Sequence, residues 1–283
     1  MRPALVWLVS LLALLAGCVS NPPRATLADG RPVDTRYTAV GQDSRVQFLI
    51  LHATEENLAD SLRILTQQDV SAHYLLTDDN PPVAYRLVDE NRRAWHAGAS
   101  QWGAATQLNA SSIGIEIVHP ASQCLPDGSV LQAPYPPQQI EALVQLVKAI
   151  VARHQIRPER ILGHSDIAPQ RKTDPGPAFP WRRLADEGLI PWPDAQRVAA
   201  LLPGYQQDLP DVAWFQAGLA RWGYAVPATG TLDDATRAVV AAFQMKYRPA
   251  RHDGQPDAET AALLQALLQA PRMPIPAAAG APR

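Results

Sequence analysis

Residues Ser112–Val118 read Ser-Ile-Gly-Ile-Glu-Ile-Val, with an isoleucine at every second position. Successive side chains of a β-strand point to opposite faces of its sheet, so this alternation predicts a strand with its isoleucines on one face. Gly114, Glu116 and Val118 then fall on the other face. A glutamate flanked by isoleucines is costly to bury without a partner. We therefore predict that Glu116 is a functional group rather than a structural one.

The segments around this strand predict an α/β domain over residues 41–200. An apolar run from Val46 predicts a strand that ends at His52, and a short run from Arg160 predicts a strand that delivers His164. The other expected elements are a helix over Glu55–Gln67 with Thr54 as N-cap, strands over Ser71–Leu76 and Val83–Val88, and an amphipathic helix over Pro137–His154. Together these predict a mixed central sheet with flanking helices.

The C-terminal part predicts a small all-α domain of three helices over residues 211–270. It contains two copies of Gly-x-x-Asp-x-x-Thr, beginning at Gly230 and Gly254. In each copy the glycine suits a turn and the aspartate suits the N-cap of the helix that follows. A helix over Val212–Trp222 precedes them. We expect residues 201–210 to be a linker and residues 271–283 to be a disordered tail, and we expect the first domain to stay folded after truncation near Leu201.

The N-terminus predicts a lipoprotein signal peptide over residues 1–17. Met1-Arg2 is followed by an apolar stretch, which ends in Leu15-Ala16-Gly17-Cys18. This end resembles a bacterial lipobox, which implies cleavage before Cys18 and lipidation of its sulfur. Residues 18–40 predict a tether. By analogy with known lipoproteins, Val19 after Cys18 favours the outer membrane, with the protein facing the periplasm. With Cys18 acylated, Cys124 is left without a disulfide partner, and we interpret it as a passive loop thiol.

Three polar residues predict a catalytic zinc site. Two histidines and an aspartate form a set that leaves one coordination position open for water. His52 and His164 supply the imidazoles, whereas generic ligand chemistry does not choose between Asp166 and Asp174 for the carboxylate. The net charge of −2 gives no basic field, so we do not expect nucleic acid as a partner.

The first domain resembles the zinc-dependent N-acetylmuramoyl-L-alanine amidases, whose fold is shared with peptidoglycan recognition proteins and phage amidases of the T7 lysozyme type. The stretches that carry the resemblance are Ile50–Thr54, Ser71–Leu76, Ala94–Gly98, Ser112–Glu116, Gly163–Pro169 and Lys172–Gly176. The second domain resembles the three-helix peptidoglycan-binding module through Phe215-Gln216, Gly223-Tyr224, Phe243-Gln244 and the two Gly-x-x-Asp-x-x-Thr copies. Both likenesses point to the bacterial cell wall.

The resemblance implies a role for each candidate residue. His52, His164 and Asp174 bind Zn²⁺, Glu116 is the general base that activates water, and Lys172 stabilises the oxyanion. Trp95 and His96 are candidates for the wall of the substrate cleft.

The implied function is hydrolysis of the amide between N-acetylmuramic acid and L-alanine in peptidoglycan or its fragments. The expected partners are muropeptides and, through Cys18, the membrane; we expect a monomer. The alternative is a non-catalytic peptidoglycan-recognition lipoprotein of the same fold. The presence of all three ligands, the base and the lysine argues against it.

Overall fold

The computed structural model describes residues 26–121, 123–124 and 130–276 and divides into two units, Met1–Gln42 and Asp43–Arg283. The predicted signal peptide and Cys18 lie outside the described residues. Over its described part, residues 26–42, the first unit contains one isolated bridge, between Thr26 and Pro32, and no helix or longer strand. No helix of the described residues is long and apolar enough to cross a membrane.

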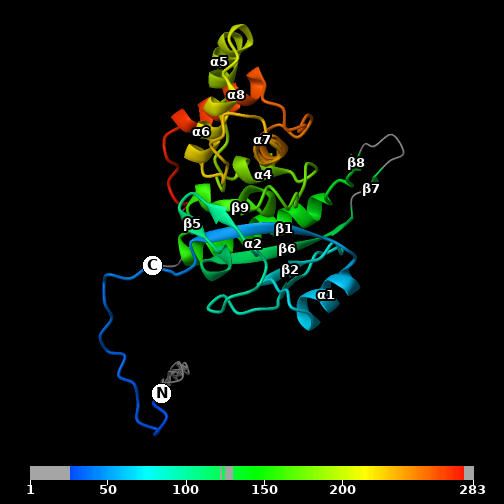
Figure 1. Ribbon diagram of the computed structural model, residues 1–283. Coiled ribbons are helices and arrows are strands. Elements are labelled where there is room, and N and C mark those ends of the chain that lie inside the picture. The colour runs from blue at the N-terminus through cyan, green and yellow to red at the C-terminus, as the bar shows by residue number, and fades with distance from the viewer. Residues whose placement is uncertain (1–25, 122, 125–129, 277–283) are drawn as a thin grey trace, which may run out of the picture. The chain divides into compact units, whose positions relative to one another are not determined.

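A mixed sheet forms the centre of the second unit (Figure 1). Among the described residues it consists of β1 (Phe48–Glu55), β2 (Tyr74–Leu76), β3 (Ala84–Arg86), β6 (Ser112–Pro120) and β9 (Ile161–Gly163), in the order β3-β2-β6-β1-β9. β1 runs parallel to both β6 and β9, and β2 runs parallel to β6. Only β3, at one edge, is antiparallel to its neighbour. The predicted fold class is therefore confirmed.

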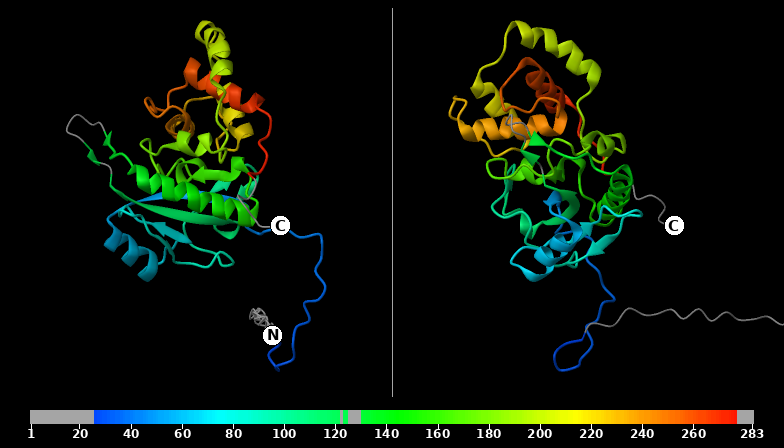
Figure 2. Two further views of the ribbon diagram at one scale, coloured as in Figure 1. Left: turned by 180° about the vertical axis from the view of Figure 1, so that it is seen from behind. Right: turned by 90° about the vertical axis from the view of Figure 1, so that its right-hand side faces the viewer.

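One face of the sheet is covered by α2 (Pro137–His154), which lies along it in Figure 2. Ile113, Ile115 and Ile117 are fully buried there, as their alternation predicts. They pack with the apolar stripe of α2, which includes Leu143 and Val147. α4 (Trp181–Asp186) completes this core.

The opposite face carries the polar residues of the same strands. α1 (Leu58–Gln67) packs on this side near β2, where Leu65 meets Val118. β1 continues three residues further than the sequence suggests, from His52 to Glu55, whose φ of 55° is left-handed. The α1 helix therefore begins later than predicted, and the Asn57 side chain caps it instead of Thr54.

The smaller elements are β4 (Gln101–Trp102), β5 (Ala105–Thr106), η1 (Leu108–Ala110), β7 (Gln123–Cys124), β8 (Val130–Leu131), η2 (Pro158–Arg160) and α3 (His164–Ile167).

Four helices make up the C-terminal part, namely α5 (Ala195–Gln207), α6 (Val212–Trp222), α7 (Asp234–Tyr247) and α8 (Ala258–Gln269). The last three match the predicted helices, and an aspartate caps each of them. The repeated motif has a clear physical basis. Gln216 bonds to Gly230 N and Thr236 Oγ1, and Gln244 bonds in the same way to Gly254 N and Thr260 Oγ1. Each buried glutamine thus connects the glycine turn of its motif to the first turn of the helix that follows.

The segment predicted as a linker is largely helical. Most of the predicted linker, residues 201–210, is the second half of α5. One apolar cluster also joins both parts, since Phe48, Trp102 and Ile167 share it with Phe215 and Phe243. At the C-terminus, Ile275 of the predicted disordered tail packs against the α2-side core.

Candidate metal centre and active site

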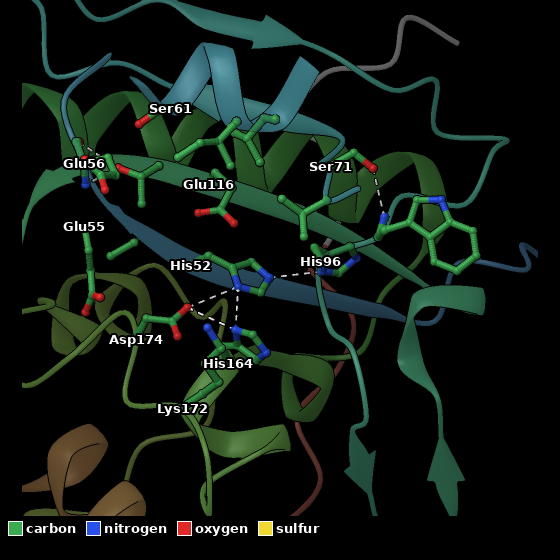
Figure 3. A pocket seen from close by; sticks show the side chains of 16 residues that line it. His52, Glu55, Glu56, Ser61, Ser71, His96, Glu116, His164, Lys172 and Asp174 are labelled. Atoms are coloured by element: carbon green, nitrogen blue, oxygen red, sulfur yellow. Dashed lines mark hydrogen bonds and ion pairs between the residues drawn. The ribbon is translucent and has the colours of Figure 1, made fainter. Parts of the chain in front are cut away.

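Three buried side chains meet where the middle of β1 lies beside the carboxyl end of β9 (Figure 3). His52 Nδ1 lies 3.1 Å from His164 Nδ1 and 3.2 Å from Asp174 Oδ2. His164 Nδ1 lies 3.3 Å from the same carboxylate oxygen. These are the ligands that the resemblance implies, and the structure brings them together.

The triangle of donor atoms fits a zinc ion better than it fits hydrogen bonding. With ligand bonds of about 2.0–2.1 Å, two ligands of a tetrahedral zinc lie about 3.3 Å apart, close to all three observed distances. An imidazole N–H points along a single direction. A single Nδ1–H of His52 therefore cannot aim at both His164 and Asp174. Two nitrogens and one carboxylate oxygen also leave a position open, as in catalytic zinc sites.

The strand register explains why the two histidines meet. Leu51 of β1 pairs with Gly163 of β9, so the next residue of each parallel strand is a histidine. Asp174 returns to this point through its backbone, because its carbonyl accepts a hydrogen bond of 2.9 Å from Ser165 N. One short turn after β9 thus presents His164 and anchors Asp174.

A relay of hydrogen bonds sets the tautomer of His52. Ser112 Oγ donates to the Leu108 carbonyl at 2.6 Å, so it accepts from His96 Nε2 at 3.1 Å. His96 Nδ1 is then an acceptor for His52 Nε2–H at 3.0 Å. The lone pair of His52 Nδ1 is left facing the cluster, as metal ligation requires.

His164 is oriented in a similar way by the neighbouring backbone. Its Nε2 lies 3.3 Å from both the Ala97 carbonyl and the Arg171 guanidinium. When Nε2–H donates to the Ala97 carbonyl, the lone pair of Nδ1 faces the cluster. Asn109 Oδ1 accepts hydrogen bonds from the backbone amides of His96 and Ala97 and so holds this segment in place. Gly114 makes room for it, since a Cβ there would lie 2.5 Å from the His96 ring. In the sequence, the close approach of the His96 ring to β6 was indicated only by Gly114, because a glycine inside a strand often marks such a contact.

The charges of the cluster suit metal ligation. Burial lowers the pKa of His52 to about 4, so the imidazole is neutral at physiological pH. Burial raises the pKa of Asp174, but the close contacts of its carboxylate with the His164 and His52 imidazoles outweigh this effect and hold the pKa below its usual value. A neutral imidazole and an ionised carboxylate are the forms that bind a metal.

Glu116 faces the cluster from β6, where its backbone pairs with that of His52. Burial, followed by the nearby Asp174 carboxylate, raises the pKa of Glu116 to about 8. Within the described residues no side chain forms an ion pair or hydrogen bond with the Glu116 carboxylate. A raised pKa on an unpaired carboxyl inside a pocket is typical of a general base or acid.

The remaining predicted residues line the same pocket (Figure 3). Lys172 lies beside the cluster, on the loop that connects the two ligands His164 and Asp174. Trp95 is 53% exposed at the mouth, with the Arg93 guanidinium 4.2 Å above its ring. His96 is buried, with its ring nitrogens bonded to His52 and Ser112.

Asp166, the alternative ligand, points away from the cluster. It is 1% exposed, and its carboxylate accepts hydrogen bonds from Tyr224, Lys246 and the Gly163 amide. Tyr224 and Lys246 belong to the C-terminal part. Sequence reasoning did not connect them with the site, because the contact joins residues 58 and 80 positions apart.

Comparison with known proteins finds a matching family for each of the two parts of the chain. The family model "N-acetylmuramoyl-L-alanine amidase" matches residues 42–177, and "Putative peptidoglycan binding domain" matches residues 208–264. The N-acetylmuramoyl-L-alanine amidase AmiD of Escherichia coli (strain K12) is 44% identical over 269 residues, which cover 93% of this chain and 96% of that protein.

Two solved structures cover most of the second unit. One is the complex of AmiD from E. coli with anhydro-N-acetylmuramic acid-L-Ala-D-gamma-Glu-L-Lys. Its TM-score is 0.78 at 43% identity, over 86% of this chain and 96% of that one. The other is AmpDh3 from Pseudomonas aeruginosa with an anhydromuramic pentapeptide, with a TM-score of 0.76 at 40% identity, over 83% and 96% of the two chains.

Proposed function

The chain belongs to the N-acetylmuramoyl-L-alanine amidase family, and we propose that it hydrolyses the amide bond between N-acetylmuramic acid and L-alanine in peptidoglycan fragments. The observation that carries the proposal is the triangle of His52, His164 and Asp174 donor atoms beside the unpaired Glu116 carboxyl. The solved relatives hold anhydromuramyl peptides, which makes muropeptides the substrate class that we propose for this chain.

His52, His164 and Asp174 would hold a zinc ion. When bound, zinc supplies a Lewis acid that polarises a carbonyl and brings the pKa of water towards about 7. The relay through His96 and Ser112 keeps the His52 Nδ1 lone pair directed at this position. The chain's own contribution is therefore a set of three donor atoms within 4.8 Å of one another, with the lone pair of His52 Nδ1 oriented by the relay.

Glu116 moves the proton. Its carboxylate accepts a proton as water attacks the carbonyl carbon, and it returns that proton to the amide nitrogen of L-alanine as the C–N bond breaks. A base whose pKa lies near the working pH serves both steps. Its apolar surroundings on β6 favour the protonated form that the second step needs.

Lys172 stabilises the charge that develops on the carbonyl oxygen. Its ammonium group extends from the loop that connects two of the ligands, on the side of the cluster away from β6 (Figure 3). Lys172 is exposed at the pocket, and a positive charge beside the developing oxyanion lowers the barrier. Trp95, at the exposed mouth, offers a flat apolar surface to the sugar ring or the stem peptide.

We further propose that the protein is a monomeric lipoprotein of the outer membrane, anchored at Cys18 and facing the periplasm. The residues Leu15-Ala16-Gly17-Cys18 support the anchor, and the matched peptidoglycan-binding module supports retention at the wall. Anchor and module together raise the local concentration of enzyme near its substrate. A Cys18→Ala variant is expected to incorporate no labelled fatty acid; incorporation equal to the parent protein would refute the anchor.

Digestion of a defined anhydromuropeptide tests the activity. Mass analysis is expected to find the intact stem peptide and the free anhydrosugar, and incubation with a chelator is expected to stop the reaction until zinc is restored. Shortened stem peptides would indicate a peptidase instead. No product from metal-loaded protein would favour the non-catalytic recognition protein.

A further inference from the structure

The C-terminal domain contacts the amidase domain at Asp166, which lies at the start of the loop that connects His164 and Asp174. Asp166 lies in α3, two residues after His164, and its Oδ2 accepts the Gly163 amide at 2.8 Å. This bond closes the first turn of α3, which presents His164. The same turn holds the Asp174 carbonyl through Ser165 N. Two of the three ligands thus depend on the position of Asp166.

Two donors from the C-terminal domain hold Asp166. Lys246 Nζ, near the end of α7, lies 2.7 Å from Asp166 Oδ2, and the Tyr224 hydroxyl donates to Oδ1. Both residues are buried, Lys246 at 5% and Tyr224 at 3% exposure. A buried carboxylate needs such partners, because removing water from an ion costs several kcal/mol.

The surroundings of Lys246 show that it serves the amidase domain. Besides Asp166, its ammonium lies 3.4 Å from the Ile161 carbonyl of β9 and 4.1 Å from the centroid of the Trp181 ring. All three neighbours belong to the amidase domain. Arg248, only two residues further, differs, since it pairs with Asp257 and Glu259 of its own domain.

The turn that carries Tyr224 is itself fixed against the amidase domain. Gly223 accepts the Gly103 amide at 2.7 Å, and the Tyr224 ring packs edge-on against Trp102 at 4.9 Å. A side chain at Gly223 would overlap the Trp102 indole. The next residue, Ala225, accepts a hydrogen bond of 3.0 Å from Gln170, which lies in the loop between His164 and Asp174. The C-terminal domain therefore holds this loop at two points.

We propose that Lys246 and Tyr224 are positioning residues of the metal centre, so that the peptidoglycan-binding domain completes the active site in addition to any contact with the wall. The inference rests on the proposed function, because it assumes that His52, His164 and Asp174 bind zinc. Neither residue touches substrate or metal. They act through Asp166, which sets where His164 and Asp174 stand.

The test compares Lys246→Met, Tyr224→Phe and Arg248→Met in the full chain. Arg248→Met is the matched control, because it also removes a largely buried cation but one paired within the C-terminal domain. Zinc affinity is measured by competition with a chromogenic chelator. Amide exchange of the peptide covering residues 163–174 is measured by mass spectrometry. We expect Lys246→Met and Tyr224→Phe to lose about 10-fold or more in zinc affinity. Their loop should exchange faster, while Arg248→Met matches the parent in both.

Each outcome separates the inference from the proposed function. Parental zinc affinity and loop exchange in both Lys246→Met and Tyr224→Phe would overturn the inference and leave the amidase proposal intact. A parent protein that binds no zinc would overturn both. If Lys246→Met does not fold, as judged by circular dichroism, Tyr224→Phe decides, because it keeps the ion pair and removes only one hydroxyl. Equal losses in all three variants would mean a general effect on stability and would also overturn the inference.

Discussion

The two faces of the central sheet are made from alternate residues of the same strands, yet only one of them gathers the polar side chains of the site. On the α2 side, β1 and β6 present leucine and isoleucine side chains that are fully buried. On the other side the same strands present His52, Ser112 and Glu116. This second face also buries apolar side chains, namely Phe48, Ile50 and Val118. One residue of register separates the leucine and isoleucine side chains of the α2 side from the polar side chains that carry the chemistry.

The comparison teaches how a polar face is kept stable. His52 and Ser112 are buried as deeply as many core residues, but each has hydrogen-bond partners. Glu116 is the exception, since its carboxyl lacks a partner among the described residues and its pKa is raised to about 8. We therefore expect changes on the polar face to affect turnover more than stability, and changes on the apolar face to do the reverse.

Removal of a metal ligand is expected to have the largest effect on turnover. His52→Ala, His164→Ala or Asp174→Ala removes one of the three donors and should abolish zinc binding, with turnover falling by roughly 10³-fold or more. The measurements are metal content by atomic emission and turnover of a soluble muropeptide. His252→Ala, at an exposed histidine of the C-terminal domain, is the control and should match the parent. If a ligand variant that contains no zinc keeps full turnover, the polar face does not carry a zinc site, and the contrast between the two faces is wrong.

Loss of the base is expected to come next. Glu116→Gln is nearly isosteric but cannot accept the proton, so turnover should fall by about 10²-fold or more while zinc content stays at the parental level. Glu56→Gln changes an exposed glutamate that lines the same pocket and serves as the control. A small loss, or one that zinc addition restores, would place the base elsewhere.

The relay behind His52 is expected to have a smaller effect. Ser112→Ala removes the acceptor that orients His96, so the tautomer of His52 is no longer set and zinc affinity should fall about 10-fold. Thr77→Val is the control, because it removes a fully buried hydroxyl that accepts the Val83 amide instead. Equal zinc affinity in the two variants would mean that the relay contributes packing and not orientation.

Sequence reasoning succeeded where one local pattern determines the answer. The isoleucine alternation predicted the strand and its faces, and the resemblance brought Asp174 into the ligand set instead of Asp166. It missed contacts that depend on packing between distant segments. His96 gave no sign that it would bond to His52, 44 positions away, and Lys246 reads as an ordinary lysine near a helix end. The helix over the predicted linker was missed for a related reason, since proline at 203 and glycine at 204 suggest an irregular segment, while α5 continues through both.

The apolar face offers the converse test, in which turnover should not change at all. Leu143 is fully buried in the core between α2 and the sheet. Leu143→Ala removes three carbon atoms there, and such truncations reduce the free energy of unfolding by about 2–5 kcal/mol. Below the unfolding transition the polar face keeps its hydrogen bonds, so turnover per folded molecule should equal that of the parent. Gln145→Ala, at an exposed position of the same helix, is the control for stability. Denaturant unfolding and turnover at low temperature are measured on the same samples. If Leu143→Ala lowers turnover or zinc affinity while the protein is still folded, the two faces are coupled through the strands, and the separation argued above fails.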